Sequence, residues 1–338
     1  MRALRVEEVG LSKLCDVPDP VAGPGEVLLS IKHVGLCGTD LNTFIGNNPN
    51  VSLPRIPGHE LGAEVLACGS GVNGLFSPGD KVVVVPYTAC GNCSSCRKGR
   101  MNACKYNRTL GVQQDGALSE RFVVPVDKLI RNESLRPRYL PLVEPLSVGF
   151  HAIERASIQK KEVVVVLGCG LIGLGAVAGA VARGAEVIAI DIAKHKTELA
   201  LSLGATHAVV GRGSDVLDEV LRITNGEGAE IVIEAVGLPE TYVQAIELAG
   251  FAGRVVYVGY AKEDVVYKTH LFNLKELDIY GSRNASSTNF SDVIKYLETL
   301  GDLAETLISK TFQLEDADQA LPYWIANRNS TMKILIEI

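Results

Sequence analysis

The chain has 338 residues, which is enough for about two domains with buried cores. It is 47% hydrophobic and 21% charged, contains 34 glycines and carries a net charge of −6. The hydrophobic content excludes intrinsic disorder, and an acidic chain without a lysine- or arginine-rich block is not expected to bind nucleic acid.

Residues 1–145 are expected to be rich in β-structure. Val27, Leu29 and Ile31 alternate with Leu28, Ser30 and Lys32, which is the pattern of a half-buried strand. The sequence predicts further strands at 82–85 and 122–126, with glycine and proline marking turns throughout.

After about residue 145, short apolar runs alternate with helical patterns. The expected strands are 163–167, 187–190, 231–236, 255–259 and a last one near Ile279. The expected helices are 172–183, 194–203, 239–249 and 290–300. This alternation predicts an α/β fold with a parallel sheet and helices on both faces. The final apolar run, 333–336, is expected to return as a strand to the first domain.

One segment has the length of a membrane span. Residues 163–182 carry no charge and include a G-x-x-x-G pattern at Gly175 and Gly179. The run opens with four valines and is broken by Gly168 and Gly170, which favours a strand, turn and helix of a globular domain. The N-terminus lacks the apolar segment of a secretory signal, so a cytoplasmic location is expected.

That segment carries a dinucleotide-binding pattern, Gly168-Cys169-Gly170-Leu171-Ile172-Gly173, between a strand and a helix. The first glycine permits a tight turn, the second lets a pyrophosphate approach, and the third lets the helix pack closely. Asp191 ends the next strand, where a carboxylate accepts the ribose hydroxyls of NAD and repels a 2′-phosphate. Ile192 follows rather than arginine, so NAD is favoured over NADP. A glycine-rich turn that binds nothing is the alternative.

Four of the eight cysteines, Cys90, Cys93, Cys96 and Cys104, lie within fifteen residues. In a reducing compartment such a cluster is expected to bind metal rather than to form disulfides. Four thiolates suit a closed, structural zinc site, which defines a lobe at 88–106. An iron–sulfur cluster is the alternative.

A second group of candidate ligands lies in the β-rich part. Cys37, His59 and Glu60 are all competent zinc ligands, although each one alone has an ordinary structural interpretation. Glu144 stands in an apolar stretch near the domain junction, where a carboxylate needs a partner.

Five motifs follow one another along the chain: GLCGTD at 35–40, PGHE at 57–60, the four cysteines, VEPLSVGFHA at 143–152 and the glycine pattern. In the order and spacing of these motifs the sequence resembles the zinc-containing medium-chain alcohol/polyol dehydrogenase family. The resemblance covers nearly the whole chain. It implies a Rossmann doubly wound sheet domain and a β-rich, GroES-like catalytic domain, with NAD and two zinc ions per chain.

The resemblance also implies roles for single residues. Cys37, His59 and Glu60 match the ligands of a catalytic zinc, and Glu144 matches an acidic position of the sorbitol-dehydrogenase branch that binds this metal directly or through water. Three further roles fall on neighbours of Cys37: a proton-relaying hydroxyl at Thr39, a histidine-orienting carboxylate at Asp40, and Asn42, where many relatives have the relay's outer histidine. Asparagine takes up no proton, so the relay must end in water, the cofactor ribose or Glu144.

The expected cofactor contacts extend beyond the three glycines and Asp191. They include Leu171, Ile172, Lys196, Val236, Gly237, Val258, Gly259 and Arg283.

Two strings narrow the substrate within the family. GVQQDG at 111–116 and GSRNA at 281–285 resemble enzymes that oxidise C5 of L-galactonate and L-gulonate, although relatives commonly have histidine where this chain has Gln113. A guanidinium at Arg283 would hold a sugar-acid carboxylate, or alternatively pair with a surface acid or a neighbouring subunit. The expected substrate contacts are Arg283, Asn284, Gln113 and Phe44. Polyols, and then L-threonine, are the alternative substrates.

The expected chemistry is hydride transfer from a secondary hydroxyl to NAD, with zinc as Lewis acid. Glu144 on the metal would add a second carboxylate and weaken that acid, so it would have to leave or be protonated when substrate binds. A catalytically silent homologue that binds NAD or zinc is the other class of function, and it would need only the structural metal.

The resemblance also implies a domain assignment and an assembly. The catalytic domain is expected at 1–147 and 296–338, and the nucleotide domain at 148–295. A homo-oligomer, dimeric or tetrameric, that takes a small-molecule substrate is expected.

Overall fold

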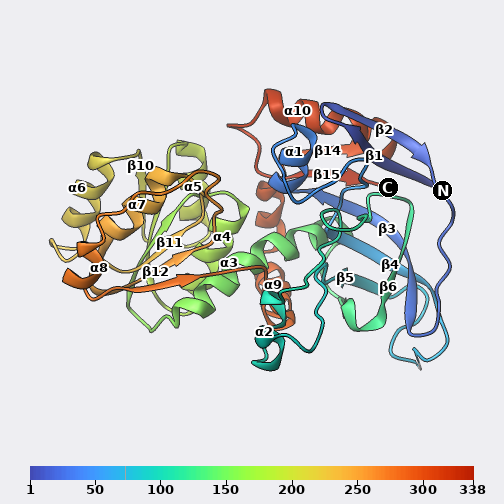
Figure 1. Cartoon of the computed structure of the whole chain (residues 1–338), viewed down its shortest axis with the longest axis horizontal. Helices are drawn as coiled ribbons and strands as arrows, with labels where there is room; N and C mark the ends of the chain where they lie inside the picture. Colours follow the sequence, from blue (N-terminus) through green and yellow to red (C-terminus); the bar gives the residue numbers. More distant parts are fainter. Residues whose placement is uncertain (73) are drawn as a thin grey trace. The chain divides into compact units, whose positions relative to one another are not determined.

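The computed structural model describes residues 1–72 and 74–338, which form two compact units (Figure 1). Unit 1 comprises Met1–Glu144 and Ser286–Ile338, and unit 2 comprises Pro145–Ala285. Each unit is described below by itself.

Unit 1 is built mainly of antiparallel strands. Two strands, β1 (Arg2–Glu8) and β2 (Leu11–Asp16), form a hairpin. The larger sheet has the order β14-β15-β3-β4-β5-β7, and β6 also pairs with β3. Its strands are β3 (Glu26–Leu36), β4 (Glu60–Cys68), β5 (Lys81–Val84), β6 (Arg121–Pro125), β7 (Leu129–Arg131), β14 (Lys310–Gln313) and β15 (Ile334–Glu337).

The apolar alternation seen in the sequence places one face of β3 in the core. Val27, Leu29 and Ile31 are buried, and the residues between them are half-buried. The C-terminal strand β15 pairs antiparallel with β3, with Ile334 opposite Leu36, so the expectation that the chain's last strand joins the first domain's sheet is confirmed.

The described part of unit 1 also contains helices. They are α1 (Gly38–Phe44), α2 (Ser94–Arg97), α9 (Ser287–Leu300) and α10 (Ala320–Ala326), with five 3₁₀ turns, Met101–Ala103, Val126–Lys128, Pro137–Leu142, Gly301–Leu307 and Leu314–Gln319. Helix α3 (Val143–Ala156) begins at the end of unit 1's first segment and continues into unit 2.

Unit 2 contains a six-stranded parallel sheet with helices on both faces (Figure 1). The strand order is β10-β9-β8-β11-β12-β13, the order of a doubly wound dinucleotide-binding fold. The strands are β8 (Val163–Leu167), β9 (Glu186–Asp191), β10 (His207–Val210), β11 (Ala229–Glu234), β12 (Ala249–Tyr257) and β13 (Asp278–Gly281). The helices are α4 (Leu171–Ala182), α5 (Lys194–Ser202), α6 (Ser214–Ile223), α7 (Pro239–Leu248) and α8 (His270–Leu274). The expected α/β class is confirmed.

Helix α4 accounts for the G-x-x-x-G pattern. A Cβ atom on Gly175 would lie 2.5 Å from the carbonyl oxygen of Leu146, and one on Gly179 would lie 3.3 Å from a side-chain carbon of Ile153. The glycines therefore let α4 pack closely on α3. No helix among the described residues is both long and apolar enough to cross a membrane.

The division into units differs in detail from the ranges expected from the sequence. The expected boundary at 295/296 would cut α9, whereas the structure keeps the whole helix with unit 1. The side chain of Phe290, on this helix, is fully buried and meets the ring of Tyr87 in unit 1. A helix anchored in one core moves with that core, which sets the boundary at Ser286.

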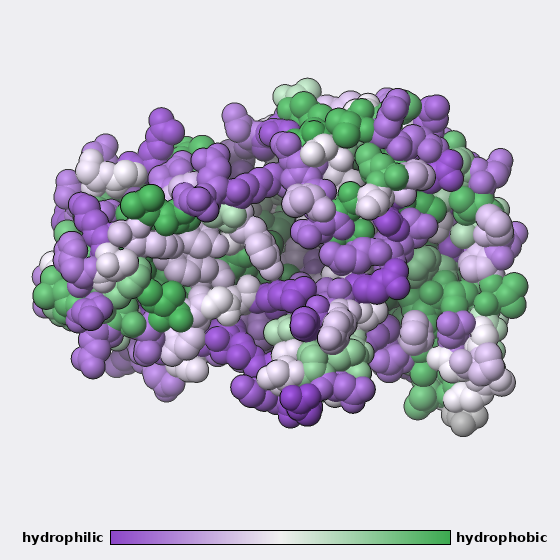
Figure 2. Space-filling view, in the orientation of Figure 1, coloured by the Kyte–Doolittle hydropathy of each residue, from purple (hydrophilic) through white to green (hydrophobic). Residues whose placement is uncertain are grey.

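Figure 2 shows a surface on which hydrophilic side chains are interrupted by scattered apolar ones.

Candidate metal centres and cofactor site

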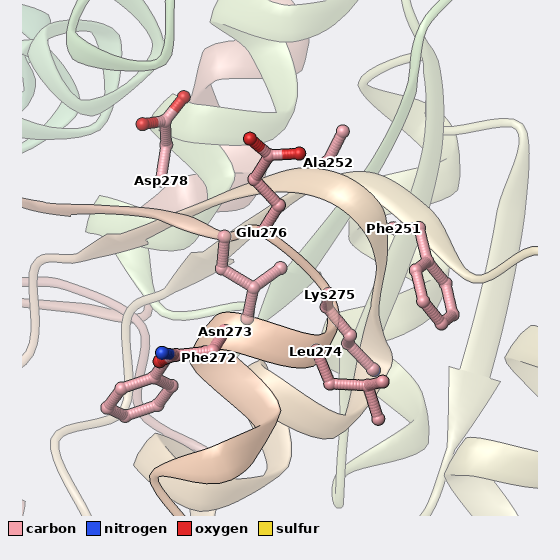
Figure 3. Close-up of a pocket in the computed structure, with 9 residues that line it drawn as sticks. Phe251, Ala252, Phe272, Asn273, Leu274, Lys275, Glu276 and Asp278 are labelled. Atoms are coloured by element: carbon pink, nitrogen blue, oxygen red, sulfur yellow. The ribbon is translucent and has the colours of Figure 1, made fainter.

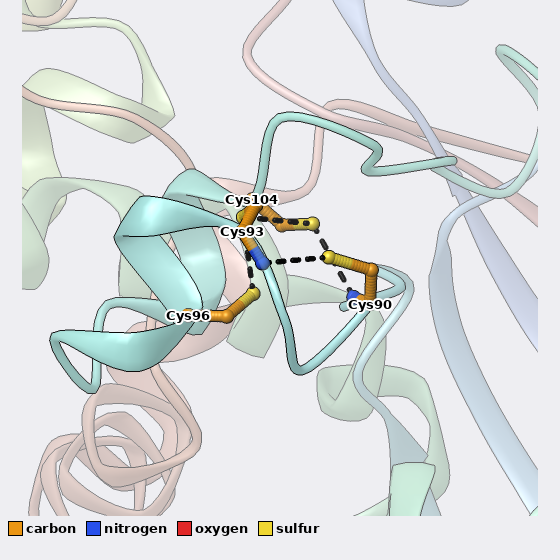
Figure 4. Close-up of side chains that lie close together, drawn as sticks. All are labelled: Cys90, Cys93, Cys96 and Cys104. Carbon is orange, nitrogen blue, oxygen red and sulfur yellow. Dashed lines mark hydrogen bonds between the residues drawn. The ribbon is translucent and has the colours of Figure 1, made fainter.

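The four cysteines of the lobe meet in space. The side chains of Cys90, Cys93, Cys96 and Cys104 converge (Figure 4), and their sulfur atoms all lie within 4.8 Å of one another. The Cys93 sulfur is 3.5 Å from that of Cys96 and 3.9 Å from that of Cys104. A tetrahedral site with Zn–S bonds of about 2.3 Å has sulfur–sulfur edges of about 3.8 Å, so the cluster fits a zinc ion.

Local hydrogen-bond donors reach the sulfur atoms of Cys93 and Cys104. The hydroxyl of Ser95 and neighbouring backbone N–H groups lower the pKa of Cys93 to about 5, whereas burial raises the pKa of Cys96 to about 11. The Cys104 sulfur accepts N–H groups from Cys90 and Tyr106, each at 3.3 Å. Hydrogen bonds to sulfur favour the thiolate, which is the form that binds a metal.

The second cluster is assembled by strand pairing. In the β3–β4 register Gly35 lies opposite Glu60, which brings Cys37, just after β3, beside His59, just before β4. The ligand atoms of Cys37, His59 and Glu60 all lie within 4.8 Å of one another. His59 and Glu60 are buried. A thiolate, an imidazole and a carboxylate are a competent zinc donor set.

Asp40 lies beside the histidine of this cluster. One oxygen, Oδ2, accepts the backbone N–H of Cys37 at 2.8 Å, and the other, Oδ1, is 3.9 Å from Nδ1 of His59. That distance is longer than a hydrogen bond, and neither of these two atoms has a hydrogen-bond partner among the described residues. Burial opposes charge on His59, but the charges of Asp40 and Cys37 outweigh it and raise the pKa of His59 well above its usual value.

Lys333 is a partner of this cluster that the sequence did not reveal. Its ammonium donates to Oε1 of Glu60 at 2.7 Å and to the carbonyl oxygen of Leu36 at 2.9 Å, and both charged side chains are buried. Burial lowers the pKa of Lys333, but the charges of Glu60 and Cys37 outweigh it and raise the pKa. A Cβ on Gly35 would lie 2.2 Å from the Glu60 carboxylate, so only glycine fits there. A lone lysine opening an apolar strand was the available signal, since a buried lysine requires a counter-charge.

Tyr87 is a second unforeseen partner. Its hydroxyl donates to Oε1 of Glu144, which stands in the first turn of α3, and both side chains are buried. The Tyr87 ring meets Phe290 edge to face with ring centres 6.3 Å apart. Burial raises the pKa of Glu144 and also, together with the Glu144 charge, that of Tyr87. Glu144 is not part of the three-residue ligand group. Nothing in the local sequence marks Tyr87.

The other residues expected in unit 1 lie at different distances from the cluster. The hydroxyl oxygen of Thr39 is 3.7 Å from the Cys37 sulfur. Asn42 is half-buried on α1, and Phe44 is buried in the core of the unit. The side-chain oxygen of Gln113 accepts the N–H of Thr109 within its own loop at 2.8 Å. Thr39 is thus beside the ligands, whereas Phe44 and Gln113 make structural contacts.

In unit 2 the glycine pattern has the geometry that a dinucleotide needs. Gly168 has a φ of +91°, which strains other residues, and a Cβ on Gly173 would lie 1.7 Å from the carbonyl oxygen of Gly168. Around Gly170, at the start of α4, a Cβ would meet nothing within 4 Å. The first and third glycines are therefore required by the turn and by packing, and the second leaves open space for a ligand. Leu171 and Ile172 form the first turn of α4.

Asp191 ties this loop to the end of β9. Its carboxylate accepts the N–H of Cys169 at 2.8 Å and that of Ala193 at 2.9 Å. A carboxylate oxygen has two lone pairs, so acceptor capacity remains for ribose hydroxyls. Ile192 is exposed, and Lys196 lies half-buried in the first turn of α5.

The remaining expected contacts in unit 2 follow strands. Val236 and Gly237 come just after β11, and Val258 and Gly259 just after β12. Arg283 and Asn284 are half-buried after β13. All six therefore lie beyond the carboxyl ends of neighbouring parallel strands, where open α/β sheets bind ligands.

A surface pocket of unit 2 is separate from these groups. It lies between Phe251 at a bend in β12 and the segment from Phe272 to Asp278 (Figure 3). None of its lining residues belongs to the sites expected from the sequence.

The comparisons with known proteins agree with this architecture. Residues 23–134 match the alcohol dehydrogenase GroES-like domain, and residues 172–299 match the zinc-binding dehydrogenase domain. The chain is 36% identical to L-galactonate-5-dehydrogenase of Escherichia coli (strain K12), over 81% of this chain and 80% of that protein. The chain belongs to the zinc-dependent medium-chain alcohol/polyol dehydrogenase family.

Other members of the family give the same result. An uncharacterized zinc-type alcohol dehydrogenase-like protein of Haemophilus influenzae is 35% identical over 94% of this chain and 92% of its own length. Sorbitol dehydrogenase of Halalkalibacterium halodurans is 31% identical over 94% and 93%.

Solved structures of this family superpose on the whole chain. Galactitol-1-phosphate dehydrogenase of Escherichia coli has a TM-score of 0.91 at 30% identity, covering 100% of both chains. An Escherichia coli alcohol dehydrogenase, RspB, solved with the cofactor NADH, has a TM-score of 0.91 at 28% identity, covering 100% of this chain and 99% of that one.

Proposed function

We propose that this zinc-dependent dehydrogenase oxidises a secondary hydroxyl of a sugar acid, at C5 of an L-galactonate- or L-gulonate-like substrate, and transfers the hydride to NAD. The observation that carries the proposal is the 36% identity with L-galactonate-5-dehydrogenase over 275 residues. Oxidation of a polyol such as sorbitol, xylitol or galactitol is the second candidate, favoured by the 31% identity with a sorbitol dehydrogenase.

Two zinc ions are proposed for each chain. Cys90, Cys93, Cys96 and Cys104 would hold a structural ion in a closed site, and Cys37, His59 and Glu60 would hold the catalytic one. When bound, the catalytic zinc would supply a Lewis acid that lowers the pKa of the substrate hydroxyl. A ligating imidazole must be neutral, so His59 would hold the metal in its neutral form.

The proton of the substrate hydroxyl is proposed to leave through Thr39. Its hydroxyl lies beside Cys37 and can both accept and donate a hydrogen bond. Asn42 offers no titratable group, so the proton must pass to water, the cofactor ribose or Glu144. Of these three, we propose Glu144 as the proton acceptor. It is a buried carboxylate of unit 1 and accepts a hydrogen bond from the hydroxyl of Tyr87.

The nucleotide is proposed to lie along the carboxyl ends of the strands of unit 2. Gly170 leaves room for the pyrophosphate, and the Asp191 carboxylate would accept the ribose hydroxyls and repel a 2′-phosphate. Lys196, at the start of α5, belongs to the same proposed site. When bound, NAD would supply the hydride acceptor.

Recognition of a sugar acid requires a group for its carboxylate. Arg283 follows β13 at the ligand-binding edge of the sheet, and a guanidinium binds a carboxylate through two parallel hydrogen bonds. Asn284, the next residue, is the proposed neighbouring polar contact. Phe44, in the core of unit 1, and Gln113, which accepts a hydrogen bond within its own loop, are the other proposed contacts with the substrate.

The test is NADH formation from NAD⁺ with L-galactonate, L-gulonate, sorbitol, xylitol, galactitol and L-threonine, on protein with a measured zinc content. Turnover confined to the two acids, and lost in Arg283→Ala, is expected. Turnover of neutral polyols would reject the sugar acid and the role of Arg283. If protein that holds two zinc ions forms no NADH with any of the six compounds, all of these substrates are rejected. If inactive protein holds only one zinc ion, a catalytically silent homologue is favoured.

A cytoplasmic, homo-oligomeric enzyme is also proposed. Eight free cysteines, four of them clustered, suit a reducing compartment. Phe251, Leu274 and Ile279 expose large apolar side chains on or near the edge strand β13, a surface that a second copy would cover. Light scattering that gives the mass of one chain would reject the oligomer.

A further inference from the structure

Glu234 is a buried carboxylate for which the proposed chemistry has no use. It is the last residue of β11, at the carboxyl end of the parallel sheet, and its side chain is 0% exposed. Burial raises its pKa, and hydrogen bonds from Gly237 and Thr241 oppose that shift. A buried carboxylate is retained when its hydrogen bonds do something that an apolar residue cannot.

The side chain organises the loop after β11. Its Oε1 accepts the N–H of Val236 at 2.9 Å and that of Gly237 at 2.8 Å. It also accepts the hydroxyl of Thr241, in the first turn of α7, at 2.7 Å. One oxygen atom therefore fixes two consecutive backbone N–H groups and ties them to the following helix.

The same residue holds the loop after β12. The backbone carbonyl of Glu234 accepts the N–H of Val258 at 2.9 Å and that of Gly259 at 3.1 Å. A Cβ on Gly259 would lie 2.3 Å from the N atom of Gly237 and 2.8 Å from Oε2 of Glu234. The two loops thus touch backbone to backbone, with the carboxylate between them.

Two tyrosines brace the second loop from its other side. The hydroxyl of Tyr242 donates to the carbonyl oxygen of Gly259, and that of Tyr257 donates to the carbonyl oxygen of Tyr242 at 2.9 Å. The two rings stack with centres 4.2 Å apart. Gly259 is consequently held on both its N–H and its carbonyl side.

The second carboxylate oxygen, Oε2, is buried without a hydrogen-bond partner among the described residues. Such an oxygen destabilises a fold, and natural proteins tolerate this mainly at functional sites. The two loops it separates follow the strands of the second mononucleotide-binding half of a doubly wound sheet, whereas Gly170 and Asp191 belong to the first half.

We propose that Glu234 is a positioning residue for the dinucleotide cofactor. Its carboxylate and carbonyl fix the backbones of Val236, Gly237, Val258 and Gly259 in the arrangement that receives the second mononucleotide of NAD. This inference rests on the proposed function, because it assumes that NAD is the ligand of unit 2.

The experiment measures the Kd of NADH by fluorescence, and the Tm, on zinc-loaded protein. Glu234→Ala is expected to raise the Kd at least about tenfold, since two loop N–H groups lose their acceptor, and Glu234→Gln, which keeps one acceptor oxygen, is expected to recover part of the affinity. The matched control is Glu230→Ala on the same strand, which also removes a carboxylate that accepts a backbone N–H, from Val163 at 2.6 Å. It is expected to leave the Kd within about twofold.

Wild-type affinity in Glu234→Ala would overturn the inference, as would equal losses of affinity in both alanine variants. If Glu234→Ala does not fold, Thr241→Val carries the test: it removes one donor to Oε1, and an unchanged Kd would overturn the inference. With the alcohol substrate held saturating and NAD varied, a positioning role predicts a raised KM for NAD with kcat nearly unchanged in Glu234→Gln. Wild-type protein that fails to bind NADH would instead reject the proposed function.

Discussion

The two candidate metal centres of unit 1 are built in opposite ways. The four-cysteine cluster comes from fifteen consecutive residues, and Cys90 at its rim is exposed. In the Cys37–His59–Glu60 cluster the last two residues are buried and Cys37 is half-buried. This cluster draws on distant parts of the chain, from the end of β3 to Lys333 just before β15.

This difference shows where each geometry originates. The lobe has little apolar side-chain burial, so a bound metal must supply much of its order. The second cluster is held by strand register and by the buried Glu60–Lys333 ion pair, so its geometry depends on contacts between distant parts of the chain. The first centre should therefore fail when its metal is lost, and the second when its supporting residues are changed.

The largest effect is expected from Lys333→Met. The change leaves the Glu60 carboxylate buried without its cation, and breaking a buried ion pair from one side lowers the free energy of unfolding by about 3–5 kcal/mol. Urea unfolding measures this loss. Lys310→Met, on the neighbouring strand β14 and exposed, is the control. A loss below about 1 kcal/mol would mean that the pair does not hold the cluster together.

Loss of a lobe ligand should act locally. Cys104→Ser is expected to lower the zinc content from two ions per chain to one and to lower the Tm, because four thiolates are needed to close the site. NADH affinity should stay near the wild-type value, because the nucleotide unit has its own core. Elemental analysis and a thermal scan measure the two effects, with Cys68→Ser as the control. Two retained zinc ions would contradict the assignment of the lobe.

Removing the carboxylate beside the second centre tests its part in proton transfer. Glu144→Gln is expected to lower kcat about 100-fold, the lower range for a lost acid–base group. Burial raises the pKa of Glu144, so in the wild type the base is lost as the pH falls through that raised pKa. The variant should lack this acidic limb of the kcat profile. Unchanged turnover and an unchanged profile would exclude Glu144 from the relay.

The smallest effect is expected from Tyr87→Phe. The ring keeps its edge-to-face contact with Phe290, and only the hydrogen bond to Glu144 is lost. A hydrogen bond to a charged group contributes about 1.5–3 kcal/mol, and that range is the expected loss in the free energy of unfolding. Tyr106→Phe, at an exposed ring, should be neutral. Equal values for both variants would show that Glu144 does not depend on this hydroxyl.

The sequence predicted the features whose physical causes are local. The turn at Gly168 and the close packing at Gly173 follow from one strand, one turn and one helix, and the structure has the backbone angle and clearance expected there. The alternation of strands and helices likewise predicted the parallel sheet of unit 2. The short strand β10 (His207–Val210) was missed because four residues carry little periodicity. Helix α6 after it was also missed, although Val216 and Val220 have helical spacing.

What the sequence could not predict was the partners that act across the fold. Lys333 meets Glu60 only because β15 pairs with β3, and Tyr87 meets Glu144 only because the loop after β5 lies beside the first residues of α3. The limit of unit 1 at Ser286 likewise depends on a contact between distant residues, that of Phe290 with Tyr87. Periodicity identifies which side chains are buried, but it does not identify which ones meet.

The late position of Lys333 also affects the order in which the protein matures. Glu60 and Lys333 are separated by 273 residues, so at roughly 5–20 residues per second about 14–55 s pass on the ribosome between their syntheses. Unit 2, continuous in sequence, is fully translated before β14 and β15 exist. At that stage the nascent chain already contains the whole nucleotide domain, but the sheet around Glu60 still lacks β14 and β15. The Glu60 carboxylate also lacks Lys333, the cation that pairs with it in the described structure.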